Sequence, residues 1–186
     1  LLDRFAQEGG LLSSLSTRSA SIVQARDIGK LVTEDGVTMP YLVLEWLDGE
    51  SLEKLLHHKE SPARGRKHEW MEAFYLLDGV ARALAVAHAA GVAHRDIKPG
   101  NFFVLGNDLY PGVMLKLLDF GIAKVMPLDK GHTQGALSEF TPMYGAPEQF
   151  DRQHGATGPW TDVYGFALVM LEVLRGILGE APALKD

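Results

Sequence analysis

The chain of 186 residues has no cysteine, which excludes disulfide bonds and thiolate metal sites and is compatible with a reducing compartment. Positive charge is also scarce. The 18 lysines and arginines are outnumbered by 24 aspartates and glutamates, and the formal net charge of −6 argues against nucleic acid as a main partner. An apolar run at residues 163–171 ends at Glu172 and Arg175, well short of the roughly 20 residues that span a bilayer. We therefore expect no membrane-crossing segment within the chain.

What is present fits a globular protein, because 46% of the residues are hydrophobic and the length is sufficient for one good-sized core. Periodicity and turn residues indicate both helices and strands. The predicted helices are 3–16, 51–58, 70–90 and 163–175, and the predicted strands are 22–30, 40–46, 102–105 and 114–118. The order indicates a small strand-bearing part followed by a mostly helical part.

Some of these elements carry finer expectations. We expect Gly9 and Gly10 to interrupt or weaken the first helix. A hairpin turn is predicted at 34–36, and helix 163–175 is apolar nearly all round and so should be buried. The polar stretch 59–68 predicts a solvated surface loop, with an anion-docking patch as the weaker alternative. Its basic residues are Arg64, Arg66 and Lys67. One face of helix 70–90 is expected to carry Phe74, Leu77, Ala81, Leu84 and His88.

Three short motifs carry the chemistry. Residues 94–101 read His-Arg-Asp-Ile-Lys-Pro-Gly-Asn, residues 119–121 read Asp-Phe-Gly, and residues 146–148 read Ala-Pro-Glu. Phosphoryl transfer from a metal-bound nucleotide needs a carboxylate to orient the acceptor hydroxyl and take its proton, which suits Asp96. The metal needs hard oxygen ligands, which suits Asn101 and Asp119.

The motifs follow one another at steps of 23 residues (Asp96 to Asp119) and 29 residues (Asp119 to Glu148). This ordered set resembles the protein kinase family. The resemblance implies an α+β fold of two lobes. Residues 1–47 would be the remnant of the small lobe and the hinge, and residues 48–186 the large lobe without its C-terminal helices. No glycine-rich phosphate loop and no strand lysine precede residue 94, so we expect the chain to cover the middle of such a domain.

For catalysis and metal binding, the resemblance assigns a role to each motif residue. Asp96 acts on the substrate hydroxyl, and Lys98 stabilises the γ-phosphate. A lysine at this position resembles serine/threonine kinases. Asn101 and Asp119 would hold Mg²⁺, with Mn²⁺ as the alternative, and Lys98 and both metal ligands would thereby contact ATP.

For the adenine of ATP, the resemblance points to the hinge at residues 41–49. The Glu45 carbonyl and the Leu47 amide and carbonyl would bind the base. Leu44 would gate the back of the pocket, and Phe103 would pack beneath the adenine.

Other residues are assigned supporting roles. His94 and Phe120 would belong to an internal stack, joined by Leu12, that ties the catalytic loop to the first helix. Glu8 on that helix matches the family's helix glutamate. Gly121 allows the backbone geometry after the stack.

Asp162 would hydrogen-bond the backbone around His94 and Arg95. A buried Arg95 beside the catalytic carboxylate would need an anion.

The remaining assignments concern the long loop at 122–147. Phosphorylated Thr133 or Ser138 would supply the anion for Arg95. Thr141 would contact the substrate and the catalytic loop. Glu148 should pair with an arginine beyond this chain, so we expect it to be unpaired here.

The function that follows for the parent domain is transfer of the ATP γ-phosphate to serine or threonine hydroxyls of a protein substrate, with autophosphorylation in trans. We expect residues 1–186 alone to be inactive. We expect a cytoplasmic domain or the cytoplasmic part of a membrane-anchored protein. One alternative is a pseudokinase-type scaffold, against which four intact motif residues argue: Asp96, Lys98, Asn101 and Asp119. The other is a small-molecule phosphotransferase of the aminoglycoside-kinase type, which the Asp-Phe-Gly and Ala-Pro-Glu segments disfavour.

Overall fold

The computed structural model describes residues 2–110, 112–120 and 142–176. The predictions for Gly121, Thr133, Ser138 and Thr141 lie outside the described residues, as does the side chain of Glu8. Among the described residues, no helix is long and apolar enough to cross a membrane.

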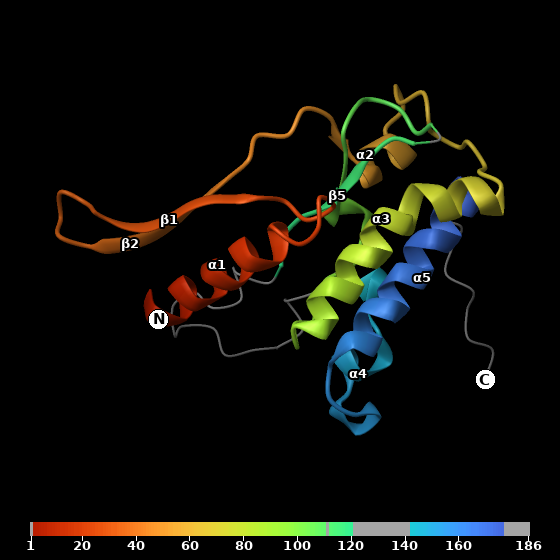
Figure 1. The fold of residues 1–186 in the computed structure, drawn as a ribbon. Coiled ribbons are helices and arrows are strands. Elements are labelled where there is room, and N and C mark those ends of the chain that lie inside the picture. Colours follow the sequence, from red (N-terminus) through yellow and green to blue (C-terminus); the bar gives the residue numbers. More distant parts are fainter. Residues whose placement is uncertain (1, 111, 121–141, 177–186) are drawn as a thin grey trace.

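The described chain is α+β and falls into two parts (Figure 1). The first contains α1 (Leu2–Ser16), β1 (Ala25–Val32) and β2 (Thr38–Leu44). The second contains β3 (Glu50–Ser51), α2 (Leu52–His57), α3 (Trp70–Ala89), the 3₁₀ helix η1 (Pro99–Asn101), β4 (Phe102–Val104), β5 (Leu115–Leu117), η4 (Pro142–Tyr144), α4 (Pro147–Phe150), η5 (Arg152–His154) and α5 (Pro159–Arg175).

Strands β1 and β2 form an antiparallel hairpin that extends away from the helical part, with α1 beside it (Figure 1). The predicted turn is present: Gly36 has a φ of 77°, and the Val37 amide donates to Thr33 Oγ1 over 3.1 Å. The first strand starts later than predicted. Residues 21–23 bond to β5 instead, with Leu117 N to Ser21 O at 2.7 Å and Val23 N to Leu117 O at 3.1 Å.

Helix α1 runs without a break through Gly9 and Gly10, so the predicted interruption is wrong. Tertiary packing explains the difference, since a β-carbon at Gly9 would lie 1.9 Å from Cδ1 of Ile28 on β1. Glycine at this position lets the helix approach the hairpin closely, and the burial of Phe5, Leu12 and Leu15 compensates for the weak helix propensity.

The helical part is built on α3 and α5, which lie side by side (Figure 1). Strands β3, β4 and β5 form a small antiparallel sheet in that order, and β5 contacts α3. Phe102 on β4 and Leu117 on β5 face each other in register and are fully buried. The core therefore runs continuously from the sheet to the two long helices.

Two helix predictions need correction. The buried face of α3 is Ala73, Leu76, Leu77, Val80, Ala83, Leu84 and Ala87, whereas Phe74 is exposed. Helix α5 begins at Pro159, before the predicted start, and buries only one side; Val163, Tyr164 and Leu171 are exposed. Among the described residues, α3 covers a single face of α5, so an all-round apolar sequence does not give all-round burial.

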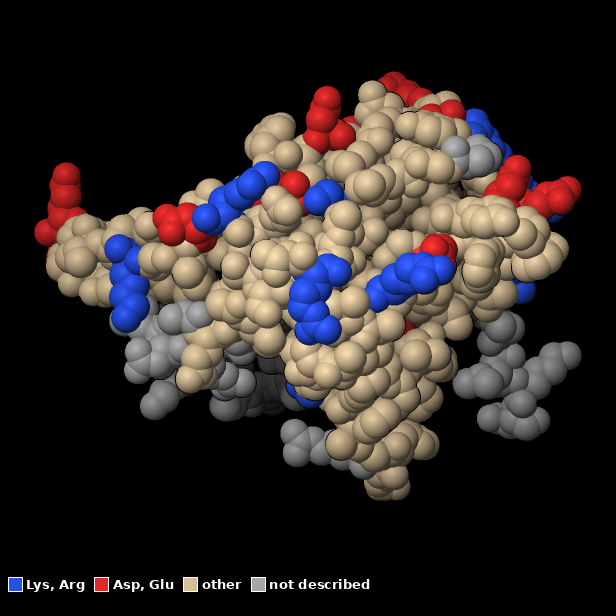
Figure 2. All heavy atoms as spheres, viewed as in Figure 1, with Lys and Arg blue, Asp and Glu red and all other residues tan. Residues whose placement is uncertain are grey.

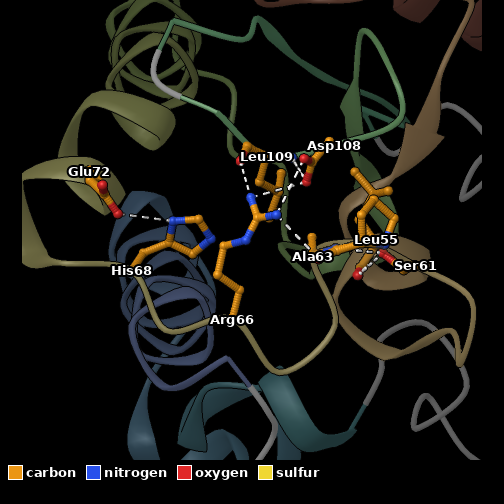
Figure 3. A network of polar contacts seen from close by, with 9 residues as sticks. Leu55, Ser61, Ala63, Arg66, His68, Glu72, Asp108 and Leu109 are labelled. Atoms are coloured by element: carbon orange, nitrogen blue, oxygen red, sulfur yellow. Dashed lines mark hydrogen bonds and ion pairs between the residues drawn. The ribbon is translucent and has the colours of Figure 1, made fainter.

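The polar stretch between α2 and α3 is largely exposed, as predicted, and it is anchored at a few points (Figure 3). Ala63 within it is fully buried. Arg66 donates to the Leu109 carbonyl over 2.7 Å and pairs with Asp108 at 3.1 Å. Because Arg66 is held by these partners, it does not form a free basic patch with Arg64 and Lys67.

On the face shown in Figure 2, acidic and basic side chains are interspersed over the upper part of the molecule. The surface toward α4 carries few charged side chains, and the chain exposes Trp160, Val163 and Tyr164 at the start of α5.

Candidate active site

One buried carboxylate on α5 anchors the loop at residues 94–98 through hydrogen bonds to its backbone. Asp162 is fully buried and accepts hydrogen bonds from the amides of His94 (2.8 Å) and Arg95 (2.6 Å). Its Oδ2 also lies 2.7 Å from Nε2 of His88 on α3. These backbone contacts are the ones the sequence assigned to Asp162, and they connect the loop to both long helices.

Backbone strain concentrates at two of the assigned residues. Arg95 (φ 65°) and Asp119 (φ 53°) are the two non-glycine residues with positive φ in the described chain. Such conformations cost about 1–3 kcal/mol each and persist where the surroundings enforce them. At Arg95, the amide is held by Asp162 and the carbonyl accepts from Nε2 of Gln149 over 2.9 Å.

The Asp96 carboxylate lies between two other assigned side chains. Lys98 Nζ is 3.0 Å from Asp96 Oδ2, and Nδ2 of Asn101 is 3.2 Å from the same oxygen. Nδ2 of Asn101 also donates to the Asp96 carbonyl over 2.7 Å. The Asp96 side chain is 19% exposed, so a hydroxyl can reach it while its direction is fixed.

The two proposed metal ligands lie on chain segments that are hydrogen-bonded to each other through the backbone. The Leu118 amide donates to the Asn101 carbonyl over 2.9 Å, which places Asp119 next to the loop. Asn101 uses its amide nitrogen for Asp96, so its side-chain oxygen is the atom available to a cation. No cluster of three or more His, Asp or Glu side chains suited to a metal occurs in the described ranges. One carboxylate and one amide oxygen fit Mg²⁺, which commonly completes its shell with phosphate oxygens and water.

His94 is a packing residue in this structure. It is buried, its ring lies 4.9 Å from that of Phe120, and its Nε2 is 2.7 Å from the Leu118 carbonyl. Because a carbonyl only accepts, Nε2 carries the proton, and Nδ1 can accept from the Asp96 amide at 3.3 Å. Burial lowers the pKa of His94 below its usual value, although the bond to Leu118 opposes the shift. Leu12 and Phe120 are both buried in the hydrophobic core cluster, and the contact of Leu12 with the stack stays a prediction.

The hinge leaves β2 at Leu44 and continues without regular structure through residues 45–48. Glu45 Oε1 accepts from the Gln24 amide over 2.8 Å and from Lys116 Nζ. Burial alone would raise the pKa of Glu45, but the bonds from Lys116 and Gln24 outweigh it and the pKa is lowered. Leu44 and Leu47 are incompletely covered, as is Phe103, which lies on β4 opposite Lys116.

Two expectations about charged partners are wrong. Arg95 is exposed rather than buried, because its left-handed backbone is fixed through the main chain and its charged side chain stays in water. The residues proposed as its anion lie outside the described ranges. Glu148 is not unpaired: its Oε1 accepts from Thr161 Oγ1 over 2.7 Å at the start of α5.

The sequence reasoning missed a second buried carboxylate. Glu172 on α5 is buried, accepts from the Tyr144 hydroxyl over 2.7 Å and lies 2.5 Å from His57 Nε2. Burial and the bond to Glu172 raise the pKa of Tyr144. The signal in the sequence is a carboxylate directly after the apolar run 163–171, where a surface residue is the ordinary expectation. Lys116, a lone charge in the strand Leu115–Leu117, was missed in the same way.

Together, the fold and the site define an α+β domain with a strand-bearing part and a helical part. Its functional loop presents a carboxylate, a lysine and an amide beside a strand that leads to a second carboxylate. The model of the protein kinase domain matches residues 2–179. The chain therefore belongs to the protein kinase family.

Curated relatives agree with this family. The chain is 34% identical over 184 residues to a probable serine/threonine-protein kinase, SCO3848, of Streptomyces coelicolor, covering 96% of this chain and 25% of that protein. It is 32% identical over 185 residues to serine/threonine-protein kinase PknB of Mycolicibacterium smegmatis (96% and 27%). It is 34% identical over 175 residues to serine/threonine-protein kinase PknA of Mycobacterium tuberculosis (94% and 37%). The chain thus spans between about a quarter and two fifths of the length of these relatives.

Proposed function

We propose that this domain transfers the γ-phosphate of ATP to serine and threonine hydroxyls of protein substrates. The observation that carries the proposal is the arrangement around Asp96, whose partly exposed carboxylate is fixed by Asn101 and Lys98 on a loop held by Asp162. The names of the relatives, all serine/threonine-protein kinases, support the same substrate class.

In this proposal, Asp96 orients the acceptor hydroxyl and takes its proton. Lys98 lies close enough to Asp96 for its positive charge to stabilise the negative charge of the transferred phosphoryl group. Asn101 and Asp119 would hold Mg²⁺, or Mn²⁺ as the alternative, and the ion would neutralise charge on the phosphates. Their oxygen-only chemistry supports this choice of cation.

For the nucleotide base, we propose that the Glu45 carbonyl and the backbone of Leu47 bind adenine, with Phe103 below it. The lack of regular structure at residues 45–48 supports this. The Glu45 amide bonds to the Gln24 carbonyl, but the Glu45 carbonyl and the Leu47 backbone lie outside the strand pairing. Leu44, at the end of β2, would limit the depth of the pocket.

Regulation is proposed on the sequence alone. Thr133 or Ser138 would be phosphorylated in trans and bind Arg95, whose exposed guanidinium is accessible to such an anion. Thr141 would contact the bound substrate, and Glu8 would take the role of the family's helix glutamate. We place the domain in the cytoplasm, where ATP is supplied.

The test is phosphoryl transfer by the full-length gene product that contains this chain. With γ-labelled ATP, Mg²⁺ and a generic protein substrate, we expect label on serine and threonine, with autophosphorylation at Thr133 or Ser138 by mass spectrometry. Turnover should be on the order of 1–100 per second on a good substrate. ATP binding without transfer would instead support a scaffold, label on a small molecule would support a small-molecule phosphotransferase, and mainly phosphotyrosine would overturn the residue specificity.

A further inference from the structure

One buried charged residue lies on β5, the strand that leads to the proposed metal ligand Asp119. Lys116 is the middle residue of β5, between the buried Leu115 and Leu117, and its side chain is only 9% exposed. A lysine this buried loses most of its hydration, so it needs a counter-ion nearby.

That counter-ion is Glu45, the first residue of the hinge, whose side chain is 14% exposed. Its Oε1 accepts from Lys116 Nζ and from the Gln24 amide at 2.8 Å. The Glu45 amide in turn donates to the Gln24 carbonyl over 2.9 Å. Both the side chain and the amide of Glu45 are therefore held, which orients its Cα and so sets the position of its carbonyl carbon.

The pair lies among the residues proposed to hold ATP. Lys116 is directly opposite Phe103 in the β4–β5 register, and it precedes Asp119 by three residues in the chain. Two residues separate Lys116 from Asp119. The Leu117 amide donates to the Ser21 carbonyl, and the Leu118 amide donates to the Asn101 carbonyl. One ion pair thus joins the base-binding side of the site to the strand that leads to the metal side.

Stability alone gives little reason for such a pair. A well-packed hydrophobic residue often replaces a buried ion pair with no loss of stability, because desolvation of both charges offsets their attraction. What an apolar replacement would not supply is a directional hold on Glu45, since hydrogen bonds depend on angle and hydrophobic contact does not.

We propose that Lys116 is a positioning residue for nucleotide binding, which through Glu45 fixes the hinge carbonyl that receives adenine. The inference rests on the proposed function, because it takes adenine to bind at this hinge. Lys116 itself touches neither the base nor the reacting atoms in this account, and acts through Glu45.

The experiment measures the affinity of the full-length gene product for ATP and for adenosine. Lys116→Met keeps the length and apolar stem of the side chain and removes the charge. We expect the Kd for both ligands to rise by the same factor, about tenfold, since the lost orientation concerns the base. The KM for ATP should rise likewise, with kcat at saturating ATP changed less than about threefold. Lys116→Arg should restore most of the affinity.

Glu45→Gln should reproduce the loss, and the double variant Glu45→Gln/Lys116→Met should be no weaker than either single variant, because both remove one interaction. The matched control is Lys54→Met, which breaks the exposed pair with Glu50 and should leave both affinities unchanged. If the wild type binds neither ligand, the proposed function fails. If the wild type binds them and the affinities of Lys116→Met and Glu45→Gln are unchanged, or fall only in proportion to the folded fraction, the role of Lys116 is refuted while the proposed function stands.

Discussion

At the residue scale, the site depends on a few buried polar groups whose protonation and direction are set by their neighbours. Asp162 holds two consecutive amides of the loop, and His94 donates to the Leu118 carbonyl on the far side of the same loop. Both side chains are buried, so each must keep its native partners to offset the loss of hydration. The geometry at Asp96 is therefore determined by residues that have no direct part in the chemistry.

His94 predicts a pH dependence of stability. Its pKa is lowered in the folded protein, mainly by burial, whereas in the unfolded chain it lies near about 6.5. Above that pH both states are neutral and the full stability is present. As the pH falls below about 6.5, the unfolded chain takes up a proton that the folded protein does not, and the free energy of unfolding decreases by up to about 1.4 kcal/mol per pH unit from this group.

The measurement is denaturant unfolding of wild type and His94→Gln at several pH values between about 5 and 8, the range around the ordinary histidine pKa. We expect a shallower decline with acid in the variant. His154→Gln is the control, because that imidazole is exposed in the folded protein. Equal slopes for wild type and His94→Gln would contradict the assignment.

At the element scale, the sequence predicts whether a segment is a helix, strand or turn better than it predicts which of its faces are buried. The turn at 34–36 and the ends of the predicted helices 51–58 and 70–90 follow from local chemistry, and the structure has them within one residue. The failures depend on contacts distant in sequence. Helix α1 continues through Gly9 because the burial of its apolar side chains compensates for the weak helix propensity, and the exposed side of α5 is set by which elements adjoin it.

The same division applies to the site. The motif residues Asp96, Lys98 and Asn101 were found because they are close in sequence, and the structure brings their side chains together. Glu45 and Lys116 are separated by 71 residues, so no local pattern indicates that they meet. The contact between Glu45 and Lys116 depends on how the strands are arranged in the fold.

Adjacent glycines in α1 give a matched pair of predictions. A β-carbon at Gly10 meets no atom within 4 Å, so Gly10→Ala should stabilise the protein by about 0.5–1 kcal/mol through helix propensity. A β-carbon at Gly9 would lie 1.9 Å from Cδ1 of Ile28, so this side chain has to move aside, and Gly9→Ala should be less stable than Gly10→Ala. Calorimetric unfolding of both variants checks this. A gain of stability from Gly9→Ala equal to that from Gly10→Ala would refute the packing explanation.

At the scale of the whole molecule, hydrogen bonds and one ion pair near the site connect the hairpin part to the helical part. The hairpin side is connected to the sheet through Ser21 and Leu117 and through Glu45 and Lys116. The catalytic loop is connected to α5 through Asp162 and to β5 through Leu118. Strand β5 and the residue directly after it therefore contact both sides: Leu117 and Lys116 bond to the hairpin side, and the Leu118 carbonyl bonds to His94 of the loop.

The central claim is that Asp96 acts on the acceptor hydroxyl and not on the nucleotide. The direct measurement compares Asp96→Asn with wild type in the full-length gene product, recording kcat for protein phosphorylation and the Kd for Mg-ATP on the same preparations. Asp78→Asn, which alters only an exposed pair with Arg82, is the control. We predict a decrease in kcat of about 10²–10⁴-fold with ATP affinity retained. Turnover near the wild-type rate, or a loss of ATP binding as large as the loss of turnover, would contradict the account.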